Sequence, residues 1–353
     1  MSQDWHLKPF SNPAFCVIPF YGIEHPANTP CCLLKPGHNL NQIKSDMLEG
    51  RRPDACATCW KLEDAGIVSD RQLKNQALDF YLDKDIRAIV DDCNNGLNST
   101  IHYKIDTSNV CNGTCVTCGS HSSSAWAQIE RKHKIKNFTQ QWTIAPVQVD
   151  NNINYTTAKS IGFRGGEPLL SQTNFHILEQ LIEHNNTDCF INFTTNGSIE
   201  LNNYQKNLLK QFKNVNFCFS IDGVGPVFEY LRFPLKWDML LENIEYCRQN
   251  GILVSTSYTV SNMNVLYHNE TMKWFNDNAL EVVTNPVQFP RHFRPNALPQ
   301  AVKKQMPQAF FTPHTDADDA DFKVFQAEIC KQDTWKKISI AKYLPEFADL
   351  INT

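Results

Sequence analysis

The sequence predicts an α/β fold whose core is a sheet of parallel strands joined by helices. From residue 100 onward, short β-branched and aromatic runs alternate with segments whose apolar residues recur at helical spacing. Repeated alternation of strand and helix produces parallel strands with helical crossovers. Gly251 stands just past one helical segment, where a C-terminal glycine is common. The alternation alone fits either a barrel or an open, doubly wound sheet.

The alternation gives six strands with five helices between them. The expected strands cover residues 101–106, 160–164, 190–195, 215–221, 253–260 and 280–289. The expected helices cover residues 122–134, 173–184, 203–212, 237–249 and 266–276.

The chain on either side of this region has a different character. Its first part is irregular, rich in Pro, Gly and Asn and poor in apolar core residues, so a bound metal is expected to stabilise it. Ser69 is expected to cap a single connecting helix over residues 69–90. We therefore expect a cysteine-rich domain (1–70), a connecting helix and loop (71–99), the sheet region (100–296) and a peripheral, helical C-terminal extension (297–353).

Composition and charge narrow the classes of partner. The chain has 33 Lys and Arg against 37 Asp and Glu, which gives a net charge of −4. This balance offers no electrostatic reason to expect nucleic acid or a membrane surface as a partner. No apolar run is long enough to span a bilayer, and the first residues lack the basic start and apolar core of a signal peptide. We therefore expect a cytoplasmic protein.

The cysteines are the residues of this sequence that indicate a chemical function. The chain has 13 cysteines, and a reducing compartment favours metal ligands or catalytic groups over disulfides. Cys111, Cys115 and Cys118 lie close together directly after the first strand expected beyond residue 100. Parallel α/β folds place their chemistry in such loops. Three thiolates can hold an iron–sulfur cluster and leave one iron open, whereas a structural zinc site would need a fourth ligand such as His121.

The spacing of this triplet resembles the signature of the radical S-adenosylmethionine (SAM) superfamily, and the resemblance extends over most of residues 100–290. It implies a partial (β/α)6 TIM-like barrel. It also implies that a 4Fe–4S cluster on the three cysteines binds SAM and cleaves it to a 5′-deoxyadenosyl radical. Thr117 departs from the family, which often has a larger or aromatic residue before the third cysteine.

Later strand ends carry further segments that resemble this family. The Gly-Gly-Glu-Pro motif at residues 165–168 matches the family segment that holds the amino group of SAM. Thr-Asn-Gly at residues 195–197 and Ser-Ile-Asp-Gly at 220–223 resemble segments that line the SAM pocket, and Arg232 is a further candidate. The residues that the resemblance assigns to SAM are Gly165, Gly166, Glu167, Thr195, Asn196, Ser220, Asp222 and Arg232. The sequence singles out no catalytic acid.

The N-terminal cysteines form a second group. Cys56 and Cys59 have the spacing of a metal knuckle. With Cys16 and either Cys31 or Cys32, of which we favour Cys32, they resemble a twitch or SPASM auxiliary-cluster domain. The resemblance implies a second 4Fe–4S cluster. A zinc knuckle would use the same four ligands.

The resemblance leaves several functions open. We expect a radical SAM enzyme that acts on a peptide or protein side chain and takes electrons from a donor such as flavodoxin or ferredoxin. The alternatives are a radical SAM enzyme that acts on RNA or a small metabolite, and a zinc-binding barrel without activity. The acidic net charge counts against RNA.

Overall fold

Seven parallel strands form one sheet, and their spatial order follows their order along the chain. The computed structural model describes residues 12–25, 29–31, 34, 37–64, 69–82, 84, 86–135 and 153–352. The strands are β1 (Gly22–His25), β2 (His102–Asp106), β3 (Ser160–Arg164), β4 (Phe190–Thr195), β5 (Val215–Ser220), β6 (Leu253–Val260) and β7 (Glu281–Pro286). The sheet forms a half-barrel, so the expected partial barrel is confirmed, with one strand more than expected.

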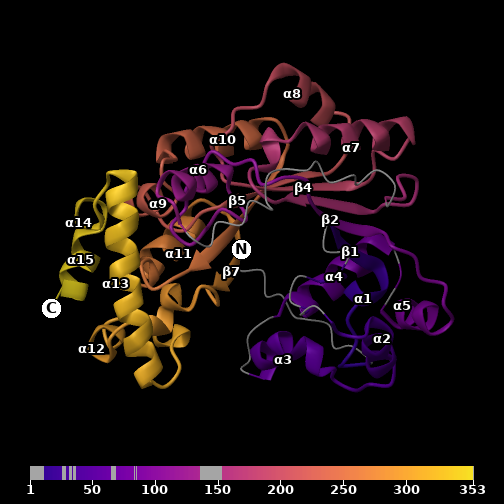
Figure 1. Ribbon diagram of the computed structural model, residues 1–353. Helices are drawn as coiled ribbons and strands as arrows, with labels where there is room; N and C mark the ends of the chain where they lie inside the picture. The colour runs from indigo at the N-terminus through magenta and orange to yellow at the C-terminus, as the bar shows by residue number, and fades with distance from the viewer. Residues whose placement is uncertain are drawn as a thin grey trace.

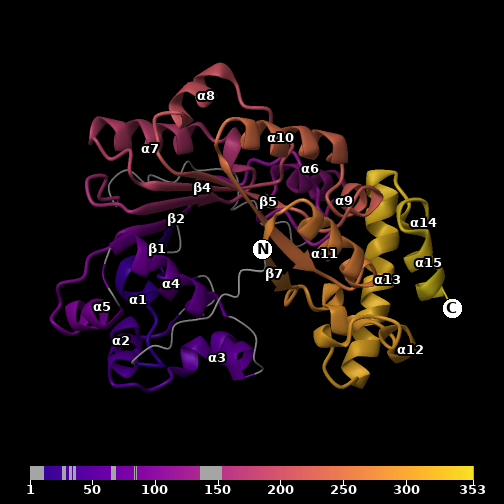
Figure 2. The same ribbon diagram turned by 180° about the vertical axis from the view of Figure 1, so that it is seen from behind.

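One face of this sheet is covered by helices α7 (Gln172–Glu183), α8 (Asn203–Leu209) and α10 (Trp237–Gln249) (Figure 1). Figure 2 shows the same helices over that face from the opposite side. The expected helices also include α6 (Ser124–Lys132) and α11 (His268–Asp277), and a short helix that we did not expect, α9 (Pro226–Leu231), precedes α10.

Side chains alternate between the two faces of the sheet because the strand period is two. Phe163, Phe193 and Phe217 point toward the helices and are buried, and the ring of Phe193 lies 5.9 Å from that of Phe175 in α7. The opposite face is polar. There the Asn216 side chain donates hydrogen bonds to Asn192 Oδ1 at 2.6 Å and to Ser255 Oγ at 2.9 Å. Complete β/α barrels fill their interior with bulky apolar side chains, so this polar face of the sheet is not a packed core.

The additional strand, β1, comes from the cysteine-rich segment that we expected to be irregular. It pairs with β2 in parallel register, with Glu24 opposite Lys104. Glu24 is only 3% exposed, and its carboxylate lies 3.1 Å from Lys104 Nζ and 2.7 Å from Arg164 Nη2. Arg164 also contacts Asp106 at 2.9 Å. The four residues of β1 have no apolar alternation that could have revealed the strand; the ion pairs and the register with β2 hold it.

The N-terminal segment also has an apolar core of its own, which the sequence analysis did not expect. Its helices are α1 (Ile18–Tyr21), α2 (Leu40–Leu48), α3 (Ala57–Asp64), α4 (Asp70–Leu82) and α5 (Ile86–Asn94). Phe15, Ile18, Ile43, Met47 and Ile89 are buried together. These residues are too scattered along the sequence to produce a periodic pattern.

The connecting helix is two helices, α4 and α5, and not the single helix expected over residues 69–90. Its expected cap is present: Ser69 Oγ accepts a hydrogen bond from the Gln72 N–H at 3.2 Å, and Gln72 Oε1 accepts one from the Ser69 N–H at 3.0 Å. Such a reciprocal pair satisfies two donors at the start of a helix. The sequence at the end of α4 contains no comparable signal, so the break between α4 and α5 was not predicted.

The C-terminal extension is helical as expected but is not peripheral. It contains α12 (Gln300–Lys303), α13 (Asp316–Lys336), α14 (Ile340–Tyr343) and α15 (Pro345–Asn352). Phe325 and Ile329 of α13 are buried in the same apolar core as the sheet. Helix α13 therefore packs as part of the main domain. Among the residues that the structure describes, we find no helix with the length and hydrophobicity needed to traverse a bilayer.

We predict that Leu178→Ala lowers the free energy of unfolding by about 2–5 kcal/mol, because it opens a cavity between α7 and the sheet. Leu178 is 0% exposed, whereas Leu97 is 72% exposed. The matched variant Leu97→Ala should change stability by no more than about 0.5 kcal/mol. Urea denaturation of both variants checks the prediction; equal effects would contradict the proposed core.

Candidate SAM and cluster site

The three central cysteines lie on the loop of residues 107–123 between β2 and α6, which we call the cysteine loop. Two backbone hydrogen bonds hold it against the segment after α9: Thr114 N donates to Phe233 O at 2.7 Å, and Val116 N donates to Leu231 O at 2.8 Å. The loop therefore stands at the carboxyl edge of the sheet, where parallel α/β folds place their chemistry.

Side chains at the start of α6 hold the same loop, and the sequence analysis missed them. Ser123 Oγ donates to Gly113 O at 2.6 Å and accepts from the N–H of Trp126 at 3.2 Å. The indole N–H of Trp126 donates to Cys115 O at 2.8 Å. A serine before a helical run that starts with a small residue is a capping signal, and it could have identified Ser123.

The thiols of Cys111 and Cys115 converge around Gly113. A Cβ atom on Gly113 would lie 3.5 Å from Cys115 Sγ and 3.8 Å from Cys111 Sγ. The Gly113 N–H donates to Cys111 Sγ at 3.4 Å. Burial raises the pKa of the Cys111 thiol to about 11. A soft donor set of thiols with backbone N–H groups aimed at sulfur fits an iron–sulfur cluster. Within the described ranges, no group of three or more His, Cys, Asp or Glu side chains is arranged to hold a single metal ion.

The two glycines of the Gly-Gly-Glu-Pro segment let its backbone approach the cysteine loop. Gly166 N donates to Ser108 O at 2.9 Å, and Glu167 N donates to Val110 O at 2.7 Å. A Cβ atom on Gly166 would lie 2.2 Å from Val110 O, which no side chain can tolerate. The resemblance assigned these glycines to SAM; the structure shows that they also make room for the loop that carries the cysteines.

Glu167 is buried directly beyond these glycines, and three donors hold its carboxylate. Oε1 accepts from the Thr195 hydroxyl at 2.8 Å and from Leu169 N at 3.2 Å, and Oε2 accepts from Asn196 N at 2.8 Å. Burial raises the pKa of Glu167 to about 7, although these hydrogen bonds act in the opposite direction. The carboxyl group is therefore held in a fixed position, and it changes its ionisation state near neutral pH.

The turn after β4 connects this carboxylate to the cysteine loop. Asn196 Nδ2 donates to Asn112 Oδ1 at 2.8 Å and lies 3.9 Å from Cys111 Sγ. Thr195 holds Glu167 and accepts a hydrogen bond from Gly197 N at 3.1 Å. Thr195 and Asn196 thus position other groups of the site.

Asp222 and Arg232 form a buried ion pair on the other side of the cysteines. Asp222 Oδ2 lies 2.9 Å from Arg232 Nη2, and Asp222 Oδ1 accepts from Thr259 N at 3.0 Å. Arg232 Nε is buried, and none of the described residues forms a hydrogen bond with it. Burial alone would lower the pKa of Arg232, but Asp222 and the thiol of Cys115 outweigh it and raise the pKa. A buried donor without a partner beside a cysteine triplet fits an anionic group of a ligand.

Ser220, the remaining residue assigned to SAM, ends β5 and is half-buried opposite Ser257 of β6. It lies at the same edge of the sheet as Asp222. The structure thus brings every residue assigned to SAM to the carboxyl ends of β3, β4 and β5.

The N-terminal cysteines line a separate hollow. Its walls include Cys16, Cys31, Cys56 and Cys59, together with Arg71. The sequence analysis favoured Cys32 over Cys31 as the fourth ligand. Cys32 lies outside the described residues, and the structure places Cys31 with the other three.

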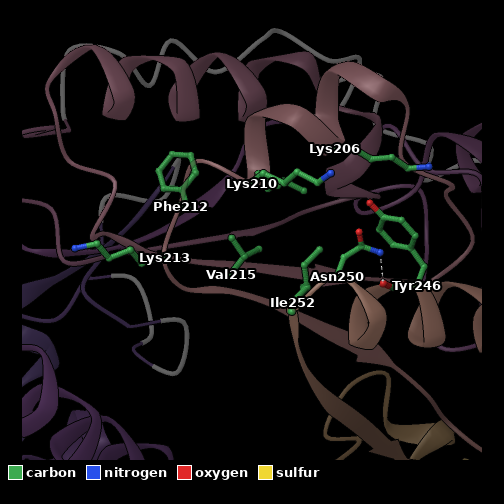
Figure 3. Close-up of a pocket in the computed structure, with 10 residues that line it drawn as sticks. Lys206, Lys210, Phe212, Lys213, Val215, Tyr246, Asn250 and Ile252 are labelled. Carbon is green, nitrogen blue, oxygen red and sulfur yellow. Dashed lines mark hydrogen bonds between the residues drawn. The ribbon is translucent and has the colours of Figure 1, made fainter.

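Another hollow, drawn in Figure 3, lies at the amino ends of β5 and β6. Its lining includes Lys206, Lys210 and Tyr246 of the covering helices and Val215 at the amino end of β5. Lys206 lies over the ring of Tyr246 at 4.8 Å. Because the cysteines stand at the opposite, carboxyl edge, this hollow is not part of their site.

Residues 105–280 match the family model of the Radical SAM superfamily. This stretch is a radical SAM domain. The match spans the cysteine loop and every residue that the sequence analysis assigned to SAM. Members of this superfamily are enzymes that use SAM and a 4Fe–4S cluster.

Solved structures that resemble the radical SAM domain and its surroundings include anSMEcpe with bound AdoMet, at 17% identity, a TM-score of 0.39 and coverage of 52% of this chain and 50% of that chain. Streptococcus suis SuiB bound to S-adenosylmethionine matches at 15% identity, a TM-score of 0.38 and coverage of 84% and 60%. This chain thus spans about half to three fifths of the length of these proteins. No curated protein matches its sequence.

We predict that Gly166→Ala lowers the free energy of unfolding by about 1–3 kcal/mol, because its Cβ would overlap Val110 O. Gly162→Ala is the matched control, since a Cβ on that glycine of β3, the strand that precedes Gly166, would meet nothing closer than 3.8 Å. Thermal unfolding and iron content after anaerobic reconstitution check the prediction. Wild-type stability and iron content in Gly166→Ala would contradict the prediction, because they would show that the cysteine loop can move away from the new Cβ at little cost in free energy.

Proposed function

We propose that this chain reductively cleaves SAM at a 4Fe–4S cluster held by Cys111, Cys115 and Cys118 and directs the resulting 5′-deoxyadenosyl radical to a hydrogen atom of a substrate. The observation that carries the proposal is the convergence of thiols, a fixed buried carboxylate and a buried arginine at one edge of the sheet: Cys111 and Cys115 meet around Gly113, and Cys118 lies close enough to interact electrostatically with both. The cluster, when bound and reduced, would supply the electron that breaks the sulfonium C–S bond of SAM.

The chain's own residues would bind and orient SAM. Glu167 can accept hydrogen bonds from its amino group, because Thr195 and Asn196 already fix the carboxylate. Arg232 can offer its Nε–H, which has no hydrogen-bond partner among the described residues, to a carboxylate or hydroxyl group. Ser220 and Asp222 lie at the next strand end, within the region suited to the ribose or the methionine part.

The polar face of the sheet supports a polar substrate, and we propose a peptide or protein side chain. The connected amides and hydroxyl of Asn192, Asn216 and Ser255 would lose hydrogen bonds to water beside an apolar substrate, at a free-energy cost. A peptide backbone can replace those bonds. We also propose that the protein works in the cytoplasm and takes its electrons from a donor such as flavodoxin or ferredoxin.

A second 4Fe–4S cluster is proposed in the N-terminal hollow, with Cys31 as the fourth ligand beside Cys16, Cys56 and Cys59. Support comes from the four thiols that line one hollow and from the guanidinium of Arg71 beside it. A cation beside thiolates favours their charged form.

We predict that Cys115→Ala abolishes 5′-deoxyadenosine formation, because it removes one of three cluster ligands. The reconstituted protein is incubated with SAM and dithionite, and the nucleoside is measured by chromatography. Cys330→Ala, which changes an exposed cysteine on α13, should retain activity. Deoxyadenosine from the Cys115 variant would overturn the assignment.

The same preparation tests the second cluster. With Cys111, Cys115 and Cys118 all changed to Ala, the protein should keep about one 4Fe–4S cluster, or four irons. Zinc or no metal in that variant would contradict an auxiliary cluster while leaving the SAM site unaffected.

We predict that SAM binds more tightly as the pH rises from 6 to 8. Glu167 must ionise to act as an acceptor on both oxygens, and its pKa of about 7 means that about a tenth of the carboxyl groups are ionised at pH 6. The affinity should therefore rise by up to about tenfold, and Glu167→Gln should flatten this part of the profile. Equilibrium binding at each pH checks it; parallel profiles for both proteins would exclude Glu167 as the titrating group.

A further inference from the structure

The last turns of α13 pack against the cysteine loop. Gln332 is 3% exposed, and its Nε2 donates to Val116 O at 3.2 Å. Lys336 is 7% exposed, and its Nζ donates to Gln332 Oε1 at 2.9 Å. A buried ammonium group on the C-terminal helix is thus connected through one side chain to the backbone between Cys115 and Cys118.

A second contact brings the same ammonium group to the loop from another direction. Lys336 Nζ lies 4.5 Å from the centroid of the Trp126 ring, and the Trp126 indole N–H donates to Cys115 O at 2.8 Å. Asp333 of the same helix accepts a hydrogen bond from the hydroxyl of Tyr230 at 2.9 Å, which fixes α13 to α9. The position of Lys336 relative to the cysteines is therefore set by several independent contacts.

Among the described residues, no carboxylate forms an ion pair with Lys336. Its nitrogen contacts the amide oxygen of Gln332 and the ring of Trp126, and the carboxylates of Asp333 and Glu328 act on its charge from farther away. A buried cation without an anion is costly. Burial lowers the pKa of Lys336 to about 8, and the charges of Cys115 and Asp333 act in the opposite direction. At neutral pH the side chain is thus mainly an ammonium ion, and thiolates of the cysteine loop would stabilise it together with the carboxylates of Asp333 and Glu328.

We propose that Lys336 raises the reduction potential of the cluster held by Cys111, Cys115 and Cys118, so that α13 is part of the redox site. This inference rests on the proposed function. Reduction adds one electron, which makes a thiolate-bound cluster more negative. A nearby fixed cation stabilises the more negative state, and net charge around a cluster is one of the properties that set its potential.

The experiment is a redox titration followed by EPR on the full-length, reconstituted protein, observing the reduced-cluster signal that changes when SAM is added. Two variants remove the charge: Lys336→Met keeps the apolar stem over Trp126, and Lys336→Gln keeps a hydrogen-bonding group. Lys336→Arg restores the charge. Lys337→Met removes a charge from the next residue, which is exposed, and serves as the control.

We expect the midpoint potential of the SAM-responsive signal to become more negative in both Lys336→Met and Lys336→Gln, and to remain near the wild-type value in Lys336→Arg and Lys337→Met. An unchanged potential in the charge-removing variants would overturn the proposal, as would an equal shift in Lys336→Arg, since that would implicate packing. Loss of iron from both charge-removing variants, with normal iron in Lys336→Arg, would also overturn it and assign Lys336 to cluster retention. If the wild type itself has no SAM-responsive signal, the proposed function fails and not this inference alone.

Discussion

The close apposition of two backbone segments determines the geometry of the whole site. Gly166 and Glu167 donate backbone hydrogen bonds to Ser108 and Val110, and the space between the two segments admits no Cβ on Gly166. This contact fixes the cysteine loop to the end of β3. It also fixes Glu167, whose carboxylate the end of β4 then holds in turn. The backbone that carries the thiols and the carboxylate is therefore fixed by this contact, and the side chains of Ser123, Trp126 and Thr195 add to it.

The two faces of the sheet differ in composition and in what they contribute to the protein. The face under α7, α8 and α10 is filled with aromatic and aliphatic side chains, whose burial provides most of the stability. The opposite face bears amides, hydroxyls and ion pairs, which bury little apolar area. That division allows the polar face to be shaped by the requirements of a ligand, because the core does not depend on it.

Much of this arrangement could be predicted from the sequence, because the strands beyond residue 100 are marked by period-two patterns and the site residues stand just after them. The parallel order then requires that Cys111, Glu167, Asn196 and Asp222 meet at one edge. Other features had no local signal. Strand β1 is four residues long, and its place in the sheet depends on Lys104 and Arg164, which lie far along the chain.

The burial of individual polar side chains could not be predicted from the sequence either. An arginine after a short helix is usually solvated, yet Arg232 is enclosed with Asp222. The contacts of α13 with the cysteine loop join residues more than 200 positions apart, as in the bond between Gln332 and Val116. Neither the charge pattern nor the helical period of α13 distinguishes Gln332 or Lys336 from the other residues of that helix.

Strand β1 has a consequence for electron transfer. It makes the N-terminal segment a hydrogen-bonded neighbour of β2, the strand from which the cysteine loop emerges. Any redox centre in the N-terminal hollow would therefore be joined to the SAM site by strand register and not by a linker. The tunnelling distance between two such centres would be a constant of the fold, unaffected by domain motion.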